Sequence, residues 1–334
     1  MEITGVLKNT SEIIILIEHF RKFFKSKGFI EKECKSLISK HDSTLRFTNS
    51  TTSVLKPYLL GTEPISDMFL IQPAMGLQGI NEWTKNNYLG LYSSYFYSMG
   101  TLSSYDKLQR SFCIMMEFLN QIDGNLCDNI YISVYMKDIE FINIIRRTKF
   151  FSKVYLDENP THYVHFYGND ILSGRNINIF LKTKDKIQEI GTLSIIEKNQ
   201  EPVAVEISFD SPLLLCGINQ LVHPILTLPA GGILNTNEVH LDEELVLCDS
   251  LNLSIALLLD GLKVQSRGRG GNLKKIINIY KQLANKLLLN NILSVSDIEL
   301  LINAELCIKN HCNYRGKIQF SETQKQEIVK NIIG

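Results

Sequence analysis

Four stretches rich in β-branched and aromatic residues follow one another between positions 163 and 209, and this run most constrains the fold. The stretches cover residues 163–167, 176–181, 190–196 and 202–209. Turn-forming residues separate most of them, as in Lys198-Asn-Gln. Short connections favour antiparallel pairing, because parallel strands need a crossover of about a dozen residues or more. The run therefore predicts an antiparallel sheet.

Helical patterns surround this run, and the chain becomes entirely helical after Leu241. The expected helices cover residues 9–28, 107–121, 138–147, 211–221, 243–259, 272–289, 296–309 and 322–333, with one further strand at 129–136. Sheet first and helices afterwards predicts an α+β domain followed by an all-α domain. Turn formers and helix breakers fill residues 228–237. We therefore place the domains at 1–232 and 233–334.

Composition narrows the class of protein. The 334 residues hold 35 Lys+Arg and 35 Asp+Glu, so no net charge draws the whole chain to nucleic acid or membrane. No stretch reaches the ~18 apolar residues of a membrane span, and the N-terminus lacks a signal-peptide pattern. The seven cysteines form no C-x-x-C pair. We expect a soluble, cytoplasmic protein with reduced thiols, no metal site and no membrane contact.

Two groups of motifs resemble alanyl-tRNA synthetases. The first lies in residues 23–28, 44–50 and 56–61, which resemble the opening helix, Phe-Thr-Asn strand and Lys…Leu-Gly turn of that family. The second, residues 249–275, resembles the family's first tRNA-binding helices and keeps their spacing at Asp249, Asp260-Gly261, Gly268-Arg269-Gly270 and Leu273-Lys274-Lys275. Between these groups, Gln72, Gly100 and Glu189-Ile190 fall in register.

The resemblance implies a class II aminoacyl-tRNA synthetase-like core, which is an antiparallel sheet flanked by helices. It covers the catalytic core and the start of the tRNA-binding helical domain, so it implies a truncated paralogue without an editing domain. In the family this core binds ATP and an amino acid. Adenylation needs cations where negative charge develops on the phosphates.

The family's nucleotide-binding positions are changed here. The motif-two arginine position falls at Leu91, the nearby glutamate at Tyr97 and an upstream arginine at Gly76. The motif-three arginine falls at Gly217, and Pro212 and Leu214 replace glycines. Each charge-assisted phosphate contact is worth roughly 1.5–3 kcal/mol. We therefore expect a degenerate ATP site, with no ATP or Mg²⁺ as cofactor and no aminoacylation.

An amino-acid pocket is expected to persist. Asp210 stands where the family grips the substrate ammonium group. Gly191 and Thr192 stand where the family has the Trp-Asn pair that frames the alanine side chain, so the pocket is expected to be enlarged. The alternative for Asp210 is a helix N-cap, a position that Asp favours. For Cys216, at the motif-three glutamate position, a core thiol and a nucleophile are both open.

Residues 263–290 form a basic segment without Asp or Glu. Apolar residues at helical spacing leave its cations outward, as expected for phosphate contacts. The resemblance places this helix beside the tRNA acceptor stem, with Arg267, Arg269, Lys274 and Lys275 as candidate contacts. The alternative is an ordinary solvated helix face.

These observations favour a synthetase-like pseudoenzyme that binds an amino acid or amine, as a sensor or as a partner of another protein, with the acceptor stem of tRNA as a second candidate partner. Two alternatives stay open. One is a biosynthetic enzyme that uses an amino acid or aminoacyl-tRNA as donor. The other is a divergent amino-acid-activating ligase. The sequence leaves open whether any reaction is catalysed and whether the chain forms a homodimer.

Overall fold

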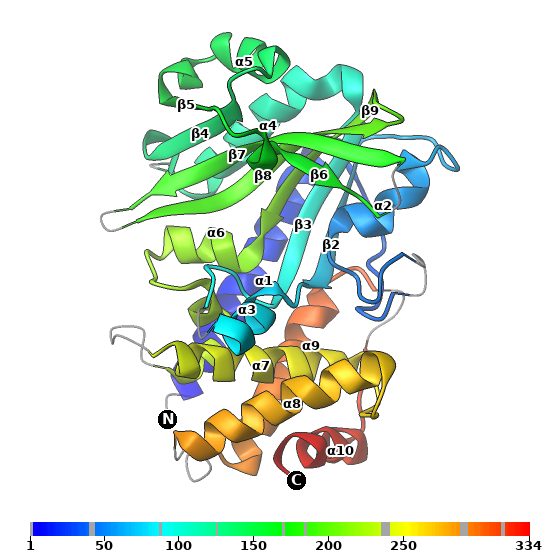
Figure 1. The fold of residues 1–334 in the computed structure, drawn as a ribbon, viewed down its shortest axis with the longest axis vertical. Coiled ribbons are helices and arrows are strands. Elements are labelled where there is room, and N and C mark those ends of the chain that lie inside the picture. The colour runs from blue at the N-terminus through cyan, green and yellow to red at the C-terminus, as the bar shows by residue number, and fades with distance from the viewer. Residues whose placement is uncertain are drawn as a thin grey trace.

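The computed structural model describes residues 3–39, 44–86, 89–124, 126–168, 171–183, 186–234, 241–287, 293–314 and 318–334. In the described chain a sheet occupies one end of the molecule and a group of helices the other (Figure 1). The helices are α1 (Ile3–Ser26), α2 (Thr51–Leu59), α3 (Gln78–Asn86), α4 (Leu108–Ile122), α5 (Ile139–Arg146), α6 (Ser211–Ile218), α7 (Asp242–Leu259), α8 (Gly268–Lys286), α9 (Val295–His311) and α10 (Glu322–Ile333).

The strands form one mixed sheet. They are β1 (Ile30–Glu31), β2 (Met68–Met75), β3 (Tyr95–Ser104), β4 (Ile130–Tyr135), β5 (Val154–Asp157), β6 (Val164–Phe166), β7 (Leu172–Lys182), β8 (Ile187–Lys198) and β9 (Glu201–Asp210). Their order is β1-β2-β3-β9-β8-β7-β4-β5, and β6 also pairs with β7. The β1–β2 and β4–β5 pairs are parallel and the others are antiparallel. The chain is therefore an α+β protein, as the sequence predicts.

Six short 3₁₀ helices complete the described structure. They are η1 (Tyr105–Lys107), η2 (Leu126–Asp128), η3 (Lys149–Lys153), η4 (Pro160–Tyr163), η5 (Pro224–Thr227) and η6 (Ala230–Ile233). No helix in the described ranges is both long and apolar enough to span a lipid bilayer.

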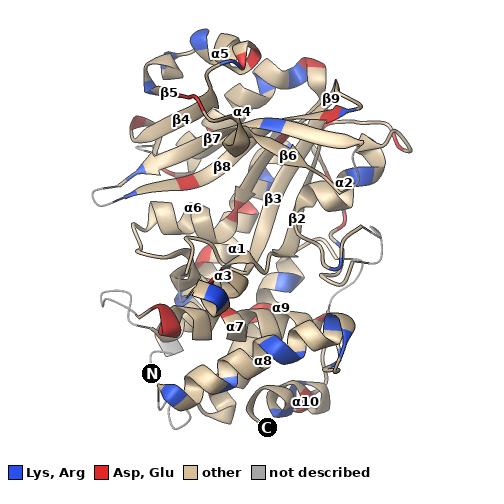
Figure 2. Cartoon of the chain, in the orientation of Figure 1, with Lys and Arg blue, Asp and Glu red and all other residues tan. Residues whose placement is uncertain are grey.

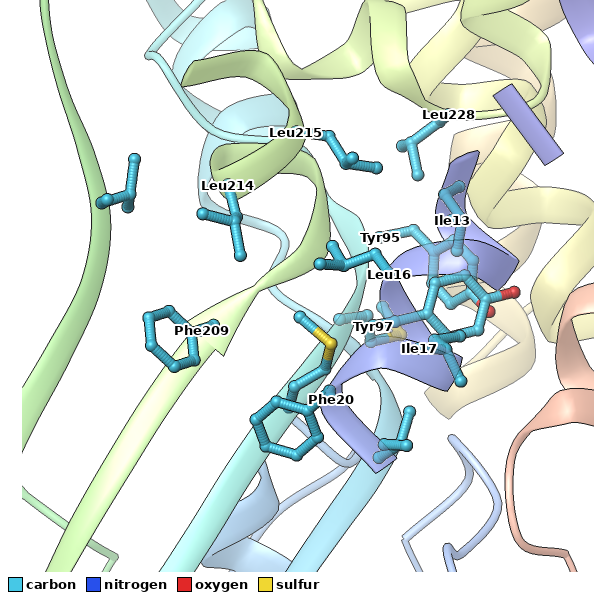
Figure 3. Close-up of a cluster of buried hydrophobic side chains, with 14 of the residues drawn as sticks. Ile13, Leu16, Ile17, Phe20, Tyr95, Tyr97, Phe209, Leu214, Leu215 and Leu228 are labelled. Atoms are coloured by element: carbon cyan, nitrogen blue, oxygen red, sulfur yellow. The ribbon is translucent and has the colours of Figure 1, made fainter. Parts of the chain in front are cut away.

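One face of the sheet is apolar and carries the main core. The rings of Phe20 and Phe24 from α1, and of Phe118 from α4, pack against Phe69 of β2 and Phe209 of β9. Ring centroids in this cluster lie 4.4–6.4 Å apart, close to the separations usual for aromatic pairs. The core continues toward α6 through Leu214 and Leu215 (Figure 3).

The C-terminal helices pack directly on the sheet domain. Helix α1 contacts α9 and η6, and α7 contacts η6 and α8. Residues 224–233, at the expected boundary, form two 3₁₀ helices that are buried almost throughout. Positions 235–237 of the expected boundary lie outside the described residues. The two expected domains therefore share one continuous core.

The sequence anticipates most elements after residue 105 and fewer before it. Helix α1 begins at Ile3, several residues earlier than expected. Residues 47–49, expected as a strand, contribute only an isolated bridge from Phe47 to Ile38, and α2 follows them. Strands β2 and β3, which lie between the edge strand β1 and β9, were not anticipated.

Candidate functional site: an acidic cavity on the polar face of the sheet

Polar side chains line the second face of the sheet. Antiparallel register places Gln72, Ser98 and Asp210 side by side across β2, β3 and β9. Ser208 and Glu206 continue the polar row along β9, because alternate residues of a strand share one face. Helix α2 covers part of this face at Gly100, where an added Cβ would lie only 2.1 Å from Oγ1 of Thr51.

Asp210 stands at the end of β9 and lines a cavity of about 170 Å³. The other lining residues are Gly76, Gln78, Tyr92, Ser93, Phe96 and Leu213. None of these lining residues is a cation. Although Asp210 occupies the N-cap position of α6, its side chain makes no capping hydrogen bond there. The helix-cap alternative therefore does not describe this carboxylate.

Three carboxyl groups share this region of the sheet. Burial, together with the negative charges of Glu189 and Glu206, raises the pKa of Asp210 to about 7. Burial also raises the pKa of Glu189 to about 7, and that of Glu206 to about 7 despite hydrogen bonds from Thr51 and Thr52. A positive charge bound in this region would therefore be stabilised electrostatically.

The cavity wall is fixed from the helical part of the chain. The carboxylate of Asp249 on α7 accepts hydrogen bonds from the backbone N–H of Ser94, at 2.9 and 3.2 Å. Asp249 is fully buried, and burial raises its pKa to about 6. Ser93, the residue before Ser94, lines the cavity. Asp249 thus holds the loop that carries Tyr92 and Ser93.

Gly191 does not enlarge the Asp210 cavity, so that expectation is wrong. An added Cβ at Gly191 would lie 2.5 Å from Cδ1 of Phe209, so the phenyl ring already fills the space beside the glycine. Phe209 is 1% exposed and belongs to the apolar face. Thr192 lies on the polar face, paired with Ser208, but neither it nor Gly191 is among the residues around the cavity.

The four expected nucleotide-binding positions are dispersed. Gly76 lines the Asp210 cavity, whereas Leu91 is 46% exposed and lies outside its lining. Tyr97 lies outside the cavity lining and donates a hydrogen bond to Glu305, so its side chain serves the buried core. At Gly217 an added Cβ would lie 3.0 Å from Cγ2 of Ile190, so this position faces β8 and has no room for an arginine.

The four candidate RNA contacts, at the start of α8 and along it, differ in exposure. Arg267, Lys274 and Lys275 are exposed, and the blue ribbon of α8 in Figure 2 marks several cations along this helix. Arg269 is half-buried and donates to the backbone carbonyl of Ser39 at 2.7 Å. Its guanidinium therefore tethers an N-terminal loop to α8, and its RNA contact stays a prediction.

A second cleft, of about 550 Å³, runs between α3 and α8. Its lining residues are Arg46, Leu77, Ile80, Asn81, Thr84, Asn272, Lys275, Ile276, Asn278, Ile279 and Gln282. They include two cations and several amides but no acid. Because Gly76 and Gln78 line the Asp210 cavity and Leu77 lines this cleft, the two hollows are neighbours along the chain.

Sequence reasoning missed several residues in and around the acidic cavity. Glu206 was not singled out, although Glu206, Ser208 and Asp210 alternate along β9 with apolar residues, a pattern that indicates a polar strand face. Tyr92 and Phe96 carry no comparable signal, because tertiary folding alone brings them to Asp210. Cys216 is fully buried and burial raises its pKa, which favours the core-thiol interpretation.

Fold and cavity together define an α+β protein with a small acidic cavity on the polar face of its sheet. In sequence the chain is distantly similar to alanine–tRNA ligases. It is 29% identical over 125 residues to alanine–tRNA ligase 1 of Lachnoclostridium phytofermentans, covering 36% of this chain and 14% of that protein. It is 30% identical over 131 residues to alanine–tRNA ligases of Burkholderia mallei and Burkholderia pseudomallei, covering 38% of this chain and 15% of each relative.

The matched region is thus a small part of these relatives' length. No family model matches the chain. Among solved structures, the aspartyl-tRNA synthetase from Entamoeba histolytica is 10% identical, with a TM-score of 0.41 and coverage of 67% of this chain and 57% of that chain.

Proposed function

We propose that the chain is a class II synthetase-like protein that binds a small amino acid or amine at Asp210 and does not activate it with ATP. The observation that carries this proposal is the acidic cavity lined by Asp210. The negative charges of Glu189 and Glu206 raise the pKa of Asp210, and no lining residue is a cation. A bound ammonium group would supply the missing positive charge. The rings of Tyr92 and Phe96 would add cation–π attraction.

The size and lining of the cavity support the absence of ATP chemistry. A cavity of about 170 Å³ is below the roughly 300 Å³ at which pockets for drug-sized ligands begin. Its lining also offers no Lys or Arg for a phosphate. We therefore expect no ATP–pyrophosphate exchange with any standard amino acid. Exchange above background would favour the divergent-ligase alternative.

The binding proposal is tested by calorimetry with three matched ligands: alanine, alaninamide and propionate. Ligands with an ammonium group should bind and propionate should not, because the site is acidic. Asp210→Asn should abolish binding while keeping the shape of the side chain. Asp106→Asn is the control, because Asp106 is exposed in η1, away from the cavity lining. Amine binding that survives Asp210→Asn would refute the assignment.

A second candidate function, contact with the tRNA acceptor stem, is favoured by the cleft between α3 and α8. Arg46 and Lys275 line it, and Lys274 is exposed on the same helix. Removing Lys274 and Lys275 together should weaken RNA binding and reduce the salt slope by about two. Lys286→Ala is the matched control, because Lys286 already pairs with Glu243 at 2.5 Å. An RNA affinity that does not change with salt concentration would exclude this function.

A further inference from the structure

Strand β5 forms one edge of the sheet and is unusually apolar for such a position. It pairs with β4 and ends the strand order, and Figure 1 shows it at the margin of the sheet. Tyr155 is 63% exposed and Leu156 is 50% exposed. Exposed apolar edge strands are templates for pairing with another chain, and proteins normally block them. We therefore expect a strand of another chain to pair with this edge.

Some backbone N–H and C=O groups of β5 point toward the outer edge of the sheet. The carbonyl of Asp157 accepts a hydrogen bond from the N–H of Met136, so Asp157 directs its backbone groups toward the β4 side. Because these groups alternate along a strand, Val154 and Leu156 direct theirs toward the outer edge. In the described part of the sheet, no strand pairs with that outer edge.

The residues around β5 are complementary to a second copy of themselves. An antiparallel pair across a twofold axis at Tyr155 sets Tyr155 opposite Tyr155 of the other copy. It also sets Val154 opposite Leu156, and Lys153 opposite Asp157, each twice by symmetry. Aromatic, aliphatic and opposite-charge pairs all stabilise neighbouring strands. The segment Lys153-Val-Tyr-Leu-Asp is therefore complementary to a second, antiparallel copy of itself.

We propose that two copies of this chain associate through β5, joining their sheets edge to edge around a twofold axis at Tyr155. The Val154–Leu156 pairs supply the main-chain hydrogen bonds, and the Lys153–Asp157 pairs set the register. Both charged side chains also have partners within one copy. Lys153 contacts the backbone carbonyls of Cys127 and Asp128, whereas Asp157 accepts from His162, Tyr163 and the N–H of Asn159. Such an isologous contact closes at a dimer.

Analytical ultracentrifugation over a range of concentrations tests the proposal. The wild-type chain should sediment as a monomer–dimer equilibrium. Tyr155→Lys places two lysines face to face at the axis and should raise the dimer dissociation constant at least about tenfold. Phe166→Lys is the matched control, because Phe166 is 74% exposed on β6, off this edge, and the same change there should leave the dimer intact. A wild-type monomer at every concentration would overturn the proposal.

A charge swap tests the register. Lys153→Asp sets carboxylates opposite Asp157 and should weaken the dimer, and adding Asp157→Lys should restore it. Thermal melting checks that each variant folds. If these charge changes perturb the monomer, a cross-link replaces them. In a background of Cys113→Ser and Cys307→Ser, Tyr155→Cys should give an oxidised dimer and Phe166→Cys should not. A dimer that does not cross-link at position 155 would also refute this interface.

Discussion

The hydroxyl of Tyr97 donates a hydrogen bond of 2.7 Å to Oε1 of Glu305, which joins the central strand β3 to helix α9. Tyr95 donates to the same oxygen, and all three side chains are buried. Burial raises the pKa of Glu305, while the positive charge of Lys309 lowers it. The sheet and the C-terminal helices are therefore held together by a buried polar contact within a shared apolar core.

Tyr97→Phe should destabilise the whole chain, because it removes one of two hydroxyl donors from a buried carboxyl group. A buried acceptor that loses a donor costs about 1–3 kcal/mol. Urea unfolding measures the loss, and a single cooperative transition should persist because the two parts share one core. Tyr131→Phe serves as the control, since Tyr131 is 41% exposed on β4. Equal midpoints for the two variants would contradict the prediction.

Arg269→Ala should lower stability by about 1–3 kcal/mol, because the backbone carbonyl of Ser39 loses its charged donor. Lys274→Ala on the same helix should change it by less than about 0.5 kcal/mol, since Lys274 is exposed. Thermal or urea unfolding of both variants makes the comparison. If Lys274→Ala proved the more damaging, the structural role of Arg269 would be wrong.

The strands that the sequence predicts best are those with one polar face. Strands β7, β8 and β9 alternate and are joined by short turns, so both their existence and their pairing follow from local pattern. Every residue of β2 is buried and Pro73 lies within it, so neither alternation nor composition identifies it as a central strand. The sequence places Asp210 in a ligand site by motif, but only tertiary packing reveals that Phe209 closes the space beside Gly191.

Gly191→Ala tests that closure. The new methyl carbon would lie 2.5 Å from Cδ1 of Phe209, so the ring or the strand must move. Overpacking of this kind typically costs about 1–3 kcal/mol. Adding Phe209→Leu should recover part of the loss by removing the clashing ring edge. Gly124→Ala, where nothing lies within 4 Å, is the control for the loss of glycine itself. If the stability losses of Gly191→Ala and Phe209→Leu simply added in the double variant, the contact between these two residues would be refuted.

The stability of the free protein should fall as pH rises from about 4 to about 7 and level off above that. The folded-state pKa values of Asp210, Glu189 and Glu206 are each raised to about 7, whereas unfolded carboxyls titrate near about 4. Between those values the folded chain binds more protons than the unfolded chain, so its stability is highest at the acidic end. Chemical denaturation across this range measures the slope. Asp210→Asn should flatten the slope, and an unchanged slope would show that Asp210 does not titrate there.

Amine binding should show the opposite dependence on pH. An ammonium ligand needs ionised Asp210, whose pKa in the free protein is about 7. Below that value the carboxyl must lose its proton before it can pair, so affinity should fall by about tenfold for each pH unit. Above it, affinity should level off while the ligand amine stays protonated. Calorimetry in buffers of different ionisation enthalpy would show one proton released at acidic pH. An affinity independent of pH between about 5 and 8 would mean that the ammonium group is held by something other than Asp210.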